Sequence, residues 1–332
     1  MASNTIKNIA IVGATGQVGK FIVSALLRKN KFNITALTRT GSSTRPPSDV
    51  RVSNVDYDKP DTLTEALKNQ DALIITMSVH APQDQSSKLI EAAAKAGVPW
   101  VLPNEFGSNS NSQAAKDAGI AIPKIKDREL IEKLGVSSWI GVACSFWYEY
   151  SLAGPMLYGI DIAKREVLWF DGGKQKIHTS TWPQVGRAVA NLLSLPVSAE
   201  GGDGKSVTLD SYRNRFVYIS SFTLSQREML DAVERVTGTN DSDWKLSSTT
   251  AEERYEDGRK RMMQGDRVGF AHAMYSRYFF PGEKAGLYGE TDGLDNERLG
   301  LQEEDLDEAT KESVRLADGE YFAKLFGGGG RN

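Results

Sequence analysis

The chain has 332 residues with a formal net charge of −3, and 40% of its residues are hydrophobic, which is enough for one large domain or two moderate ones. The near-neutral charge argues against nucleic-acid binding, because no basic stripe is available to neutralise phosphates. A single cysteine, Cys144, argues against a disulfide framework, and we expect no signal peptide, no membrane span and a cytoplasmic location.

Strand and helix signals alternate along the first half of the chain. Apolar runs predict strands at residues 6–13, 33–39, 50–56, 72–78, 100–103 and 137–144. Apolar residues at helical spacing predict helices at residues 18–26, 62–69, 83–96 and 122–135. Strands separated by helices indicate an α/β fold, with a doubly wound parallel sheet of Rossmann type.

The second half of the chain is aromatic-rich and lacks this clean alternation. Residues 181–195 predict an amphipathic helix and 215–221 a strand, so segments around 180–222 are expected to return to the main sheet. Residues 225–280 are typical of helices, and the acidic run at 302–314 predicts a solvated terminal helix. We expect one domain over residues 1–150 and a smaller C-terminal α+β domain over 151–332.

A glycine-rich turn, GATGQVG, joins the first predicted strand to the first predicted helix. Bare backbone lets amide groups approach a diphosphate, and the start of a helix offers unpaired N–H groups and a positive dipole end. A P-loop is excluded here, because the outer glycines are one residue too far apart. The alternative is a tight turn that binds nothing. The residues predicted to bind a dinucleotide are Gly13, Thr15, Gly16, Gln17, Val18 and Gly19.

The end of the second predicted strand indicates which dinucleotide is bound. A carboxylate about 20 residues after the turn would favour NAD, but Arg39 stands there. A guanidinium can bind a 2′-phosphate through paired donors, and Arg45 in the following loop could add a second charge. We therefore predict NADP(H), with Thr40 also at the site; the alternative for Arg39 is a solvated charge at a strand end.

Four motifs resemble the isoflavone reductase-like, or NmrA-like, branch of the atypical short-chain dehydrogenase/reductases. They are GATGQVGK, the LTR that ends the second strand, VLPNEFG at 101–107 and KIKDRELIE at 124–132. The match runs in order through residues 6–150 and continues loosely to the end. The resemblance implies an NADP-binding domain at 1–150, a substrate-binding domain at 151–332, a small-molecule substrate, and a monomer or homodimer.

A lysine replaces the usual proton-transfer pair. No tyrosine in the chain has a lysine four residues later, so the ordinary Tyr-x-x-x-Lys pair is absent. The family instead keeps a Lys-x-x-x-Arg helix, which maps onto Lys124 and Arg128. These residues share a helix face, where a neighbouring cation disfavours a second positive charge. Spacing alone favours solvated charges, and it is the resemblance that implies Lys124 as the catalytic residue. Solvated helix charges are the alternative, with Lys126 as the fallback.

Further site residues follow the predicted strands. Glu105 comes just after the fifth strand, where it could act as an acid or base, or as a salt-bridge partner for the cofactor loop. The resemblance implies that Phe106 and Phe146 wall the nicotinamide. Ser78 is expected near the cofactor ribose or phosphates, and Gln85 matches a helix start of the family.

Departures from the plant members of the family concern the predicted substrate pocket. The predicted pocket residues are His80, Trp147, Tyr148 and Tyr150. His178 and His272 are expected on the surface or as satisfied core residues, and no residue spacing indicates a metal. The tryptophan-rich segment resembles fungal secondary-metabolism members, whereas Gln184-Val185-Gly186-Arg187 departs from the plant sequence Asp-Ile-Gly-Arg.

Three functions remain open from the sequence. The first is an NADP(H)-dependent reductase of a small aromatic or alkaloid-like metabolite, with Lys124 and Glu105 managing the proton. The second is an NADP(H)-binding enzyme that catalyses a non-redox acid/base rearrangement. The third is a non-catalytic redox sensor of the NmrA-like type, which would report the state of the bound dinucleotide to a protein partner.

Overall fold

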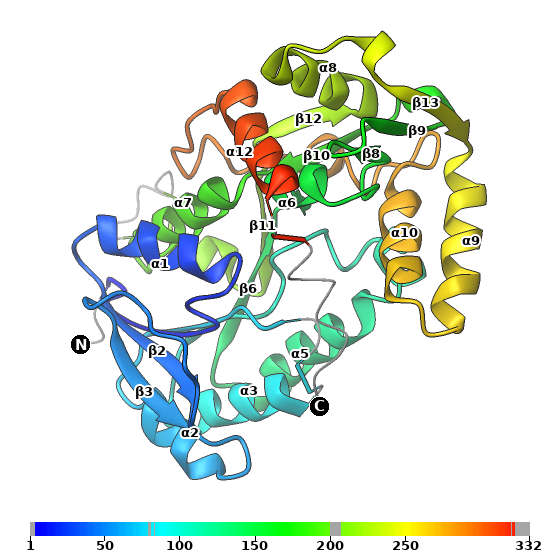
Figure 1. The fold of residues 1–332 in the computed structure, drawn as a ribbon. Coiled ribbons are helices and arrows are strands. Elements are labelled where there is room, and N and C mark those ends of the chain that lie inside the picture. Colours follow the sequence, from blue (N-terminus) through cyan, green and yellow to red (C-terminus); the bar gives the residue numbers. More distant parts are fainter. Residues whose placement is uncertain (1–3, 79–80, 83, 200–206, 320, 323–332) are drawn as a thin grey trace.

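The computed structural model describes residues 4–78, 81–82, 84–199, 207–319 and 321–322 (Figure 1). Within these residues a seven-stranded parallel sheet has the order β11-β6-β5-β4-β1-β2-β3. Its strands are β1 (Asn8–Val12), β2 (Asn33–Arg39), β3 (Arg51–Val55), β4 (Ala72–Ile75), β5 (Trp100–Leu102), β6 (Ser138–Ala143) and β11 (Arg215–Tyr218). The predicted Rossmann-type sheet is confirmed.

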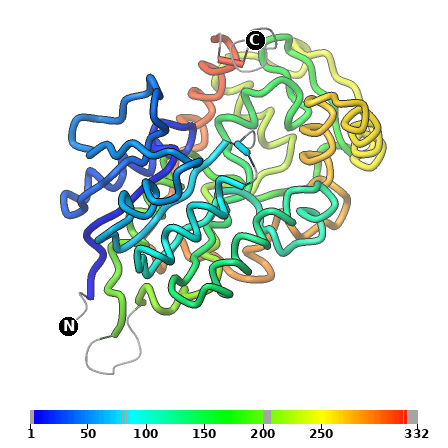
Figure 2. Tube along the Cα trace, turned by 90° about the horizontal axis from the view of Figure 1, so that it is seen from below, coloured from blue at the N-terminus to red at the C-terminus, as the bar shows by residue number. Residues whose placement is uncertain are grey.

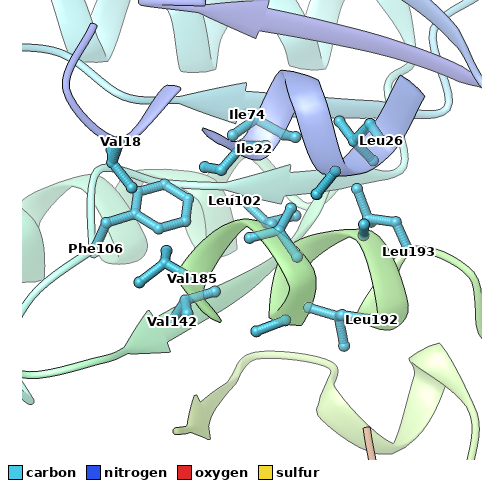
Figure 3. Close-up of a cluster of buried hydrophobic side chains, with 14 of the residues drawn as sticks. Val18, Ile22, Leu26, Ile74, Leu102, Phe106, Val142, Val185, Leu192 and Leu193 are labelled. Atoms are coloured by element: carbon cyan, nitrogen blue, oxygen red, sulfur yellow. The ribbon is translucent and has the colours of Figure 1, made fainter. Parts of the chain in front are cut away.

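Helices cover both faces of this sheet, as the strand sequences require. Ile9 and Ile11 of β1 pack toward α1 (Gly19–Arg28) and α7 (Trp182–Leu192). The alternate residues, Ala10 and Val12, pack toward the opposite face. That face is covered by α2 (Pro60–Leu67), α3 (Asp84–Ala96) and α5 (Ala121–Leu134). Figure 3 shows the core between α1 and α7, with Val18, Ile22 and Leu26 above Val185, Leu192 and Leu193.

Two elements from the second half of the chain belong to the central sheet and its covering helices. Strand β11 pairs with β6 in parallel, with Arg215 opposite Ile140. Helix α7 lies against α1, where Gly186 allows close approach, because a Cβ there would lie 2.4 Å from the Phe21 carbonyl oxygen. The sheet and its covering helices are therefore built from both halves of the sequence.

Two smaller sheets and the remaining helices form a second region around its own core. One sheet contains β7 (Phe146–Trp147), β10 (Lys176–Ser180) and β12 (Phe222–Ser225); the other contains β8 (Ile160–Asp161), β9 (Glu166–Phe170) and β13 (Lys245–Thr249). The helices are α4 (Gln113–Asp117), α6 (Tyr148–Ala153), α8 (Gln226–Thr237), α9 (Ala251–Met263), α10 (Arg267–Tyr278), α11 (Tyr288–Thr291) and α12 (Leu306–Asp318). Short 3₁₀ turns occupy Asp171–Gly173, Leu209–Tyr212 and Asp241–Asp243. Figure 2 shows the α9–α10 pair on the side of the molecule opposite the first 60 residues.

The C-terminal helix α12 corrects one expectation. The acidic run does form a helix, but the helix is not simply solvated, since Thr310, Ser313 and Leu316 are buried. It packs against α6 and α8, and the hydroxyl groups of Tyr148 and Thr310 are hydrogen-bonded at 2.7 Å. Small polar residues on the buried face hid this packing from the hydrophobic pattern.

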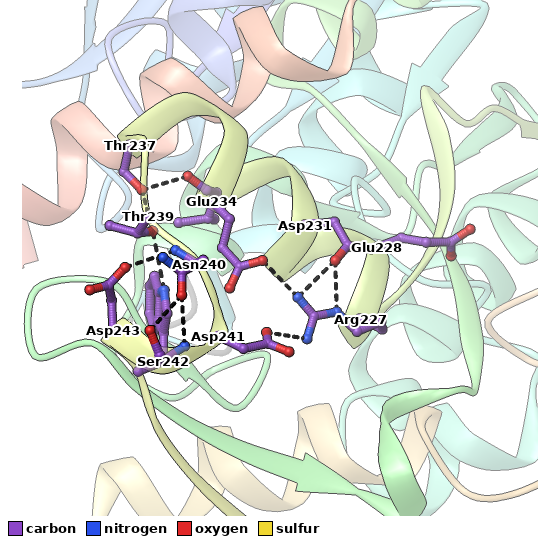
Figure 4. A network of polar contacts seen from close by, with 12 residues as sticks. Arg227, Glu228, Asp231, Glu234, Thr237, Thr239, Asn240, Asp241, Ser242 and Asp243 are labelled. Carbon is purple, nitrogen blue, oxygen red and sulfur yellow. Dashed lines mark hydrogen bonds and ion pairs between the residues drawn. The ribbon is translucent and has the colours of Figure 1, made fainter.

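A polar network fixes the chain after α8 (Figure 4). Arg227 donates to Asp231 at 2.8 Å, to Glu234 at 2.9 Å and to Asp241 at 2.7 Å. Its guanidinium also lies over the ring of Trp169, 5.3 Å from the centroid. The acidic residues of this cluster therefore have a structural role in joining α8 to the turn before β13. Among the described residues, no helix combines the length and apolar character that crossing a membrane requires.

Candidate functional site

A cavity lies at the carboxyl ends of the central strands. The strand order of the sheet reverses between β1 and β4, which is where ligands bind in open α/β sheets. The cavity has a volume of about 380 Å³, within the range of small-molecule sites. Its lining includes Gly13, Ala14 and Thr15 after β1, Arg39 at the end of β2 with Ser42 and Thr44 after it, and Thr76, Met77 and Ser78 after β4.

The glycine turn is pressed against the end of β4. Gly13 has a φ of +78°, and a Cβ there would lie 2.0 Å from the Thr76 carbonyl oxygen. A Cβ on Gly19 would lie 2.0 Å from the Gly13 carbonyl oxygen, whereas one on Gly16 would meet that oxygen at 3.1 Å. Gly13 and Gly19 are therefore required by packing inside the protein itself. This contact with β4 places the turn beside the cavity.

The start of α1 faces the same turn. Helix α1 begins at Gly19, and its N-cap residue, Val18, provides no side-chain acceptor for the first N–H groups. Val18 is buried in the core, and Thr15 lines the cavity. Gln17 points elsewhere, since its side-chain amide donates to the Tyr321 hydroxyl at 2.6 Å. An uncapped helix start beside a cavity is suited to binding an anion.

The residues after β2 divide into one that lines the cavity and two that shape the loop. Arg39 is exposed at the end of β2 and lines the cavity. The backbone N–H and the hydroxyl of Thr40 both donate to the Val55 carbonyl oxygen, at 3.1 and 3.3 Å. Arg45 folds back on its own loop, donating to the carbonyl oxygens of Ser42 at 3.1 Å and Thr44 at 3.4 Å.

Three further residues line the cavity, and the sequence analysis gave them only a general place or missed them. Ser78 and Gln85 both line it. Tyr57 is a lining residue that the sequence analysis missed; burial raises the pKa of its phenol, and the positive charge of Arg39 opposes that rise. Its place directly after the third predicted strand, which ends at residue 56, is the signal that could have found it. His80 lies outside the described residues.

A second cluster forms between the loop after β5 and helix α5. Glu105 is fully buried, and Arg128 donates to its Oε1. The Lys124 Nζ lies 3.7 Å from Oε2 of the same carboxylate. The Lys124 side chain is 21% exposed, compared with 7% for Arg128 and 0% for Glu105. Of these three charged groups, Lys124 is therefore the one that a small molecule can reach.

Neighbouring residues fix the buried guanidinium of this cluster. Arg128 donates to the Ser110 hydroxyl at 2.5 Å and to the Asn111 side-chain oxygen at 2.6 Å. Ser110 in turn donates to Oε1 of Glu105 at 2.8 Å. The guanidinium carbon also lies 5.0 Å from the ring centroid of Trp139 and 4.9 Å from that of Phe216. Sequence reasoning missed Ser110 and Asn111; their place in the polar loop after NEFG was the available signal.

The cavity and the charged cluster lie at the same edge of the sheet. The Asn104 side chain donates to the carbonyl oxygen of Met77, a lining residue, at 3.1 Å. Gly107 forms a parallel bridge with Ala143 at the end of β6, and a Cβ on Gly107 would lie 3.6 Å from the Lys124 Nζ. The loop after β5 therefore connects the ends of β4 and β6 and carries Glu105 between them.

Phe106 and Phe146, the two residues predicted to contact the nicotinamide, are both largely buried. Phe106 packs against Val18 in the core beneath the glycine turn (Figure 3). Phe146 is stacked on Tyr275, with ring centroids 4.2 Å apart, and meets Tyr278 edge-on at 5.2 Å. The Tyr278 hydroxyl donates to Ser108 at 2.7 Å, which docks α10 onto the loop after β5. Contact of these rings with a nicotinamide stays a prediction.

The predicted pocket residues after β6 separate into two groups. Tyr148 is fully buried against α12 and so does not line an open pocket in this structure. Trp147 and Tyr150 are half-buried and belong to an aromatic cluster, with ring centroids 6.2 Å apart. The other rings of the cluster are Phe21, Trp182, Tyr321 and Phe322.

His178 is a buried and satisfied core residue, whereas His272 is only partly buried. His178 Nε2 accepts from the Gly289 N–H at 3.1 Å, and Nδ1 is bonded to the Thr223 hydroxyl at 2.9 Å. Burial lowers the pKa of both His178 and His272 to about 4, so both rings are neutral at physiological pH. In the part of the chain that the structure describes, no group of three His, Cys, Asp or Glu side chains could hold a metal ion.

Comparisons with known proteins agree with this architecture. The model of the NmrA-like family matches residues 5–156. An oxidoreductase of Aspergillus flavus, aprR, is 31% identical over 281 residues, covering 81% of this chain and 86% of that protein. An isoflavone reductase crystal structure has a TM-score of 0.70 at 20% identity, over 92% of this chain and 98% of that one.

A leucoanthocyanidin reductase from Vitis vinifera, in complex with NADPH, has a TM-score of 0.68 at 16% identity, over 93% of this chain and 99% of that one. The two structural comparisons support the Rossmann-type fold and the smaller region beside it. Together with the family match and the fungal relative, they agree with the motifs of the glycine turn and of the Lys-x-x-x-Arg helix. The chain therefore belongs to the NmrA-like family of isoflavone reductase-like proteins.

Proposed function

We propose that the protein is an NADP(H)-dependent reductase of a small aromatic or alkaloid-like molecule. The observation that carries the proposal is the position of the cavity, with Arg39 at its wall and the Lys124 cluster at the same edge of the sheet. The similarity to an oxidoreductase of Aspergillus flavus and to an NADPH-bound plant reductase supports it.

The residues present fit this dinucleotide. Gly13 and Gly19 hold the turn against β4, so that backbone and the uncapped start of α1 face the place where a diphosphate would bind. Arg39, with the hydroxyl-bearing loop residues Ser42 and Thr44, would bind the 2′-phosphate that distinguishes NADPH from NADH. The bound cofactor would supply the hydride.

The protein would supply the proton and the charge balance. Lys124 holds a proton at Nζ and is partly exposed, so it can donate to a substrate atom that gains electrons. Glu105 would hold Lys124 in place and would not itself contact substrate, since it is fully buried. One carboxylate between two cations leaves a net positive charge, which would stabilise a developing negative charge on a substrate oxygen.

Isotope transfer tests this function. Purified protein is incubated with NADPH deuterated at the transferable position and a panel of flat aromatic enones, imines and benzylic ethers, and the products are analysed by mass spectrometry. A product that carries one deuterium supports a reductase. A rearranged product with no deuterium and no loss of NADPH would instead indicate the non-redox alternative. NADPH binding without turnover across the panel would indicate the redox-sensor alternative, whose partner binding would then depend on the cofactor.

A further inference from the structure

The last described residues connect the two regions of the molecule at the glycine turn. Helix α12 is held in the second region by the Tyr148–Thr310 hydrogen bond and by the ion pair between Arg235 and Asp307, at 2.6 Å. Figure 1 shows α12, in red, beside α6. Beyond this helix, Tyr321 and Phe322, which we call the C-terminal strap, contact the first region.

Both side chains of the strap are anchored. The Phe322 side chain is 7% exposed and belongs to the same core cluster as Val18, with its ring centroid 5.2 Å from that of Tyr150. The ring of Tyr321 lies 5.1 Å from that of Phe322, and its hydroxyl accepts a hydrogen bond from the Gln17 side chain at 2.6 Å. The strap is therefore packed into the aromatic cluster beside the turn and is also bonded to the turn.

The contact between Tyr321 and Gln17 stabilises the glycine turn without blocking its backbone amides. The bond ends on the side-chain amide of Gln17, while the backbone of the turn keeps its own bond from the Gly16 N–H to the Gly13 carbonyl oxygen, at 2.9 Å. Burial raises the pKa of the Tyr321 phenol, so the ring stays uncharged at neutral pH and does not repel a diphosphate. An uncharged donor–acceptor contact to a side chain leaves the backbone amides of the turn to bind phosphate.

We propose that Tyr321 is a positioning residue for the dinucleotide: through Gln17, the C-terminal strap holds the glycine turn in its phosphate-binding conformation and slows release of the cofactor. The inference rests on the proposed binding of NADP(H) at this turn. It also makes cofactor retention depend on α12, which packs mainly against α6 and α8 of the second region. Fixing a turn before binding lowers the conformational cost of binding, which improves retention more than association.

The test measures NADPH release from the full-length protein. The dissociation rate is followed by tryptophan fluorescence in stopped flow, and affinity by calorimetry, for wild type, Tyr321→Phe, Gln17→Ala and the double variant. Tyr321→Phe keeps the ring and removes one hydrogen bond, so release should be about 3- to 10-fold faster with little change in association. The double variant should release NADPH no faster than Gln17→Ala alone, because both changes remove the same contact.

A matched control is Tyr255→Phe, which removes a hydroxyl that donates to the Asp117 carbonyl oxygen in the second region and should leave NADPH release unchanged. Phe322→Ala should also speed release; if it fails to fold, Tyr321→Phe alone decides. Release from Tyr321→Phe at the wild-type rate, or more slowly, would overturn the strap while leaving the proposed function intact. A folded wild-type protein that binds no NADPH would overturn both.

Discussion

The Nζ of Lys124 lies 3.7 Å from Oε2 of Glu105, while the other oxygen of that carboxylate is bonded to the buried Arg128. Oε2 has no hydrogen-bond partner within the described residues, so the lysine is its electrostatic partner. One carboxylate is therefore paired with two cations, the buried Arg128 and the partly exposed Lys124. This arrangement separates two residues that share one turn of α5: Arg128 anchors Glu105, whereas Lys124 is partly exposed and is the residue that we propose faces the reacting molecule.

Removal of the Lys124 amine should abolish most of the chemistry without affecting cofactor binding. We expect Lys124→Ala to lower the single-turnover rate by ~10²–10⁴, the range for a lost general acid or base. The NADPH dissociation constant should stay within a few-fold of wild type. Lys126→Ala, on the exposed side of the same helix, is the control and should be near wild type in rate. A large rate loss in Lys126→Ala with none in Lys124→Ala would reverse the assignment.

Neutralising the buried Glu105 should reduce stability more than neutralising the exposed Glu129. Glu105→Gln leaves the buried Arg128 guanidinium without its carboxylate, which should lower the free energy of unfolding by about 3–5 kcal/mol. Glu129→Gln, on the exposed face of α5, should change it by less than about 0.5 kcal/mol. Urea unfolding followed by circular dichroism measures both. Equal stability of the two variants would mean that the buried ion pair does not stabilise the loop after β5.

The glycines of the turn should differ in their tolerance of a methyl group. Gly19→Ala places a Cβ 2.0 Å from the Gly13 carbonyl oxygen, so the turn itself must open, at a cost of about 1–3 kcal/mol. Gly16→Ala meets the same oxygen at 3.1 Å and should be milder. Thermal unfolding of the two variants should show the larger loss for Gly19→Ala. The reverse order would contradict the packing described for this turn.

Glu149 should make stability depend on pH. Burial raises the pKa of Glu149 to about 8, and the nearby carboxylates of Glu304 and Glu312 act in the same direction, although the Trp182 N–H donates to it. The folded protein therefore keeps a proton that the unfolded chain loses near pH 4.5, so this group's contribution is full below that pH and decreases as pH rises to about 8.

Glu149→Gln is the variant that tests this dependence. Because each unit of pKa shift corresponds to about 1.4 kcal/mol, the wild type should lose several kcal/mol relative to the variant between pH 5 and pH 8. Chemical unfolding at a series of pH values measures the difference. Parallel curves for the two proteins across this range would show that the buried carboxyl does not titrate as described.

The sequence predicted the sheet well because its strands are continuous apolar runs with helices between them. The return of β11 was also anticipated, since RFVY has the same apolar character as the central strands. The glycine turn and Arg39 could be placed because they follow strands directly, and the carboxyl ends of parallel strands meet at one edge.

The remaining features depend on contacts between distant residues that no local pattern records. Tyr57 lines the cavity from the end of a different strand, and Tyr321 meets Gln17 across 304 positions of sequence. The pairing of Arg128 with Glu105 was hidden for the same reason, since spacing on a helix shows which residues share a face but not which loop covers that face.

The central claim is that the cavity at the ends of β1, β2 and β4 binds NADP(H), selected by Arg39. Calorimetric titration of wild type, Arg39→Ala and Arg51→Ala with NADPH and with NADH tests it most directly. Arg51 is an exposed arginine at the opposite end of the neighbouring strand and serves as the control. Loss of charge-assisted bonds to one phosphate should weaken NADPH binding to Arg39→Ala by about 10- to 100-fold.

The account predicts that wild type and Arg51→Ala bind NADPH tightly and NADH weakly, and that Arg39→Ala loses this preference. Equal weakening of both dinucleotides in Arg39→Ala, or no binding of either to the folded wild-type protein, would contradict it.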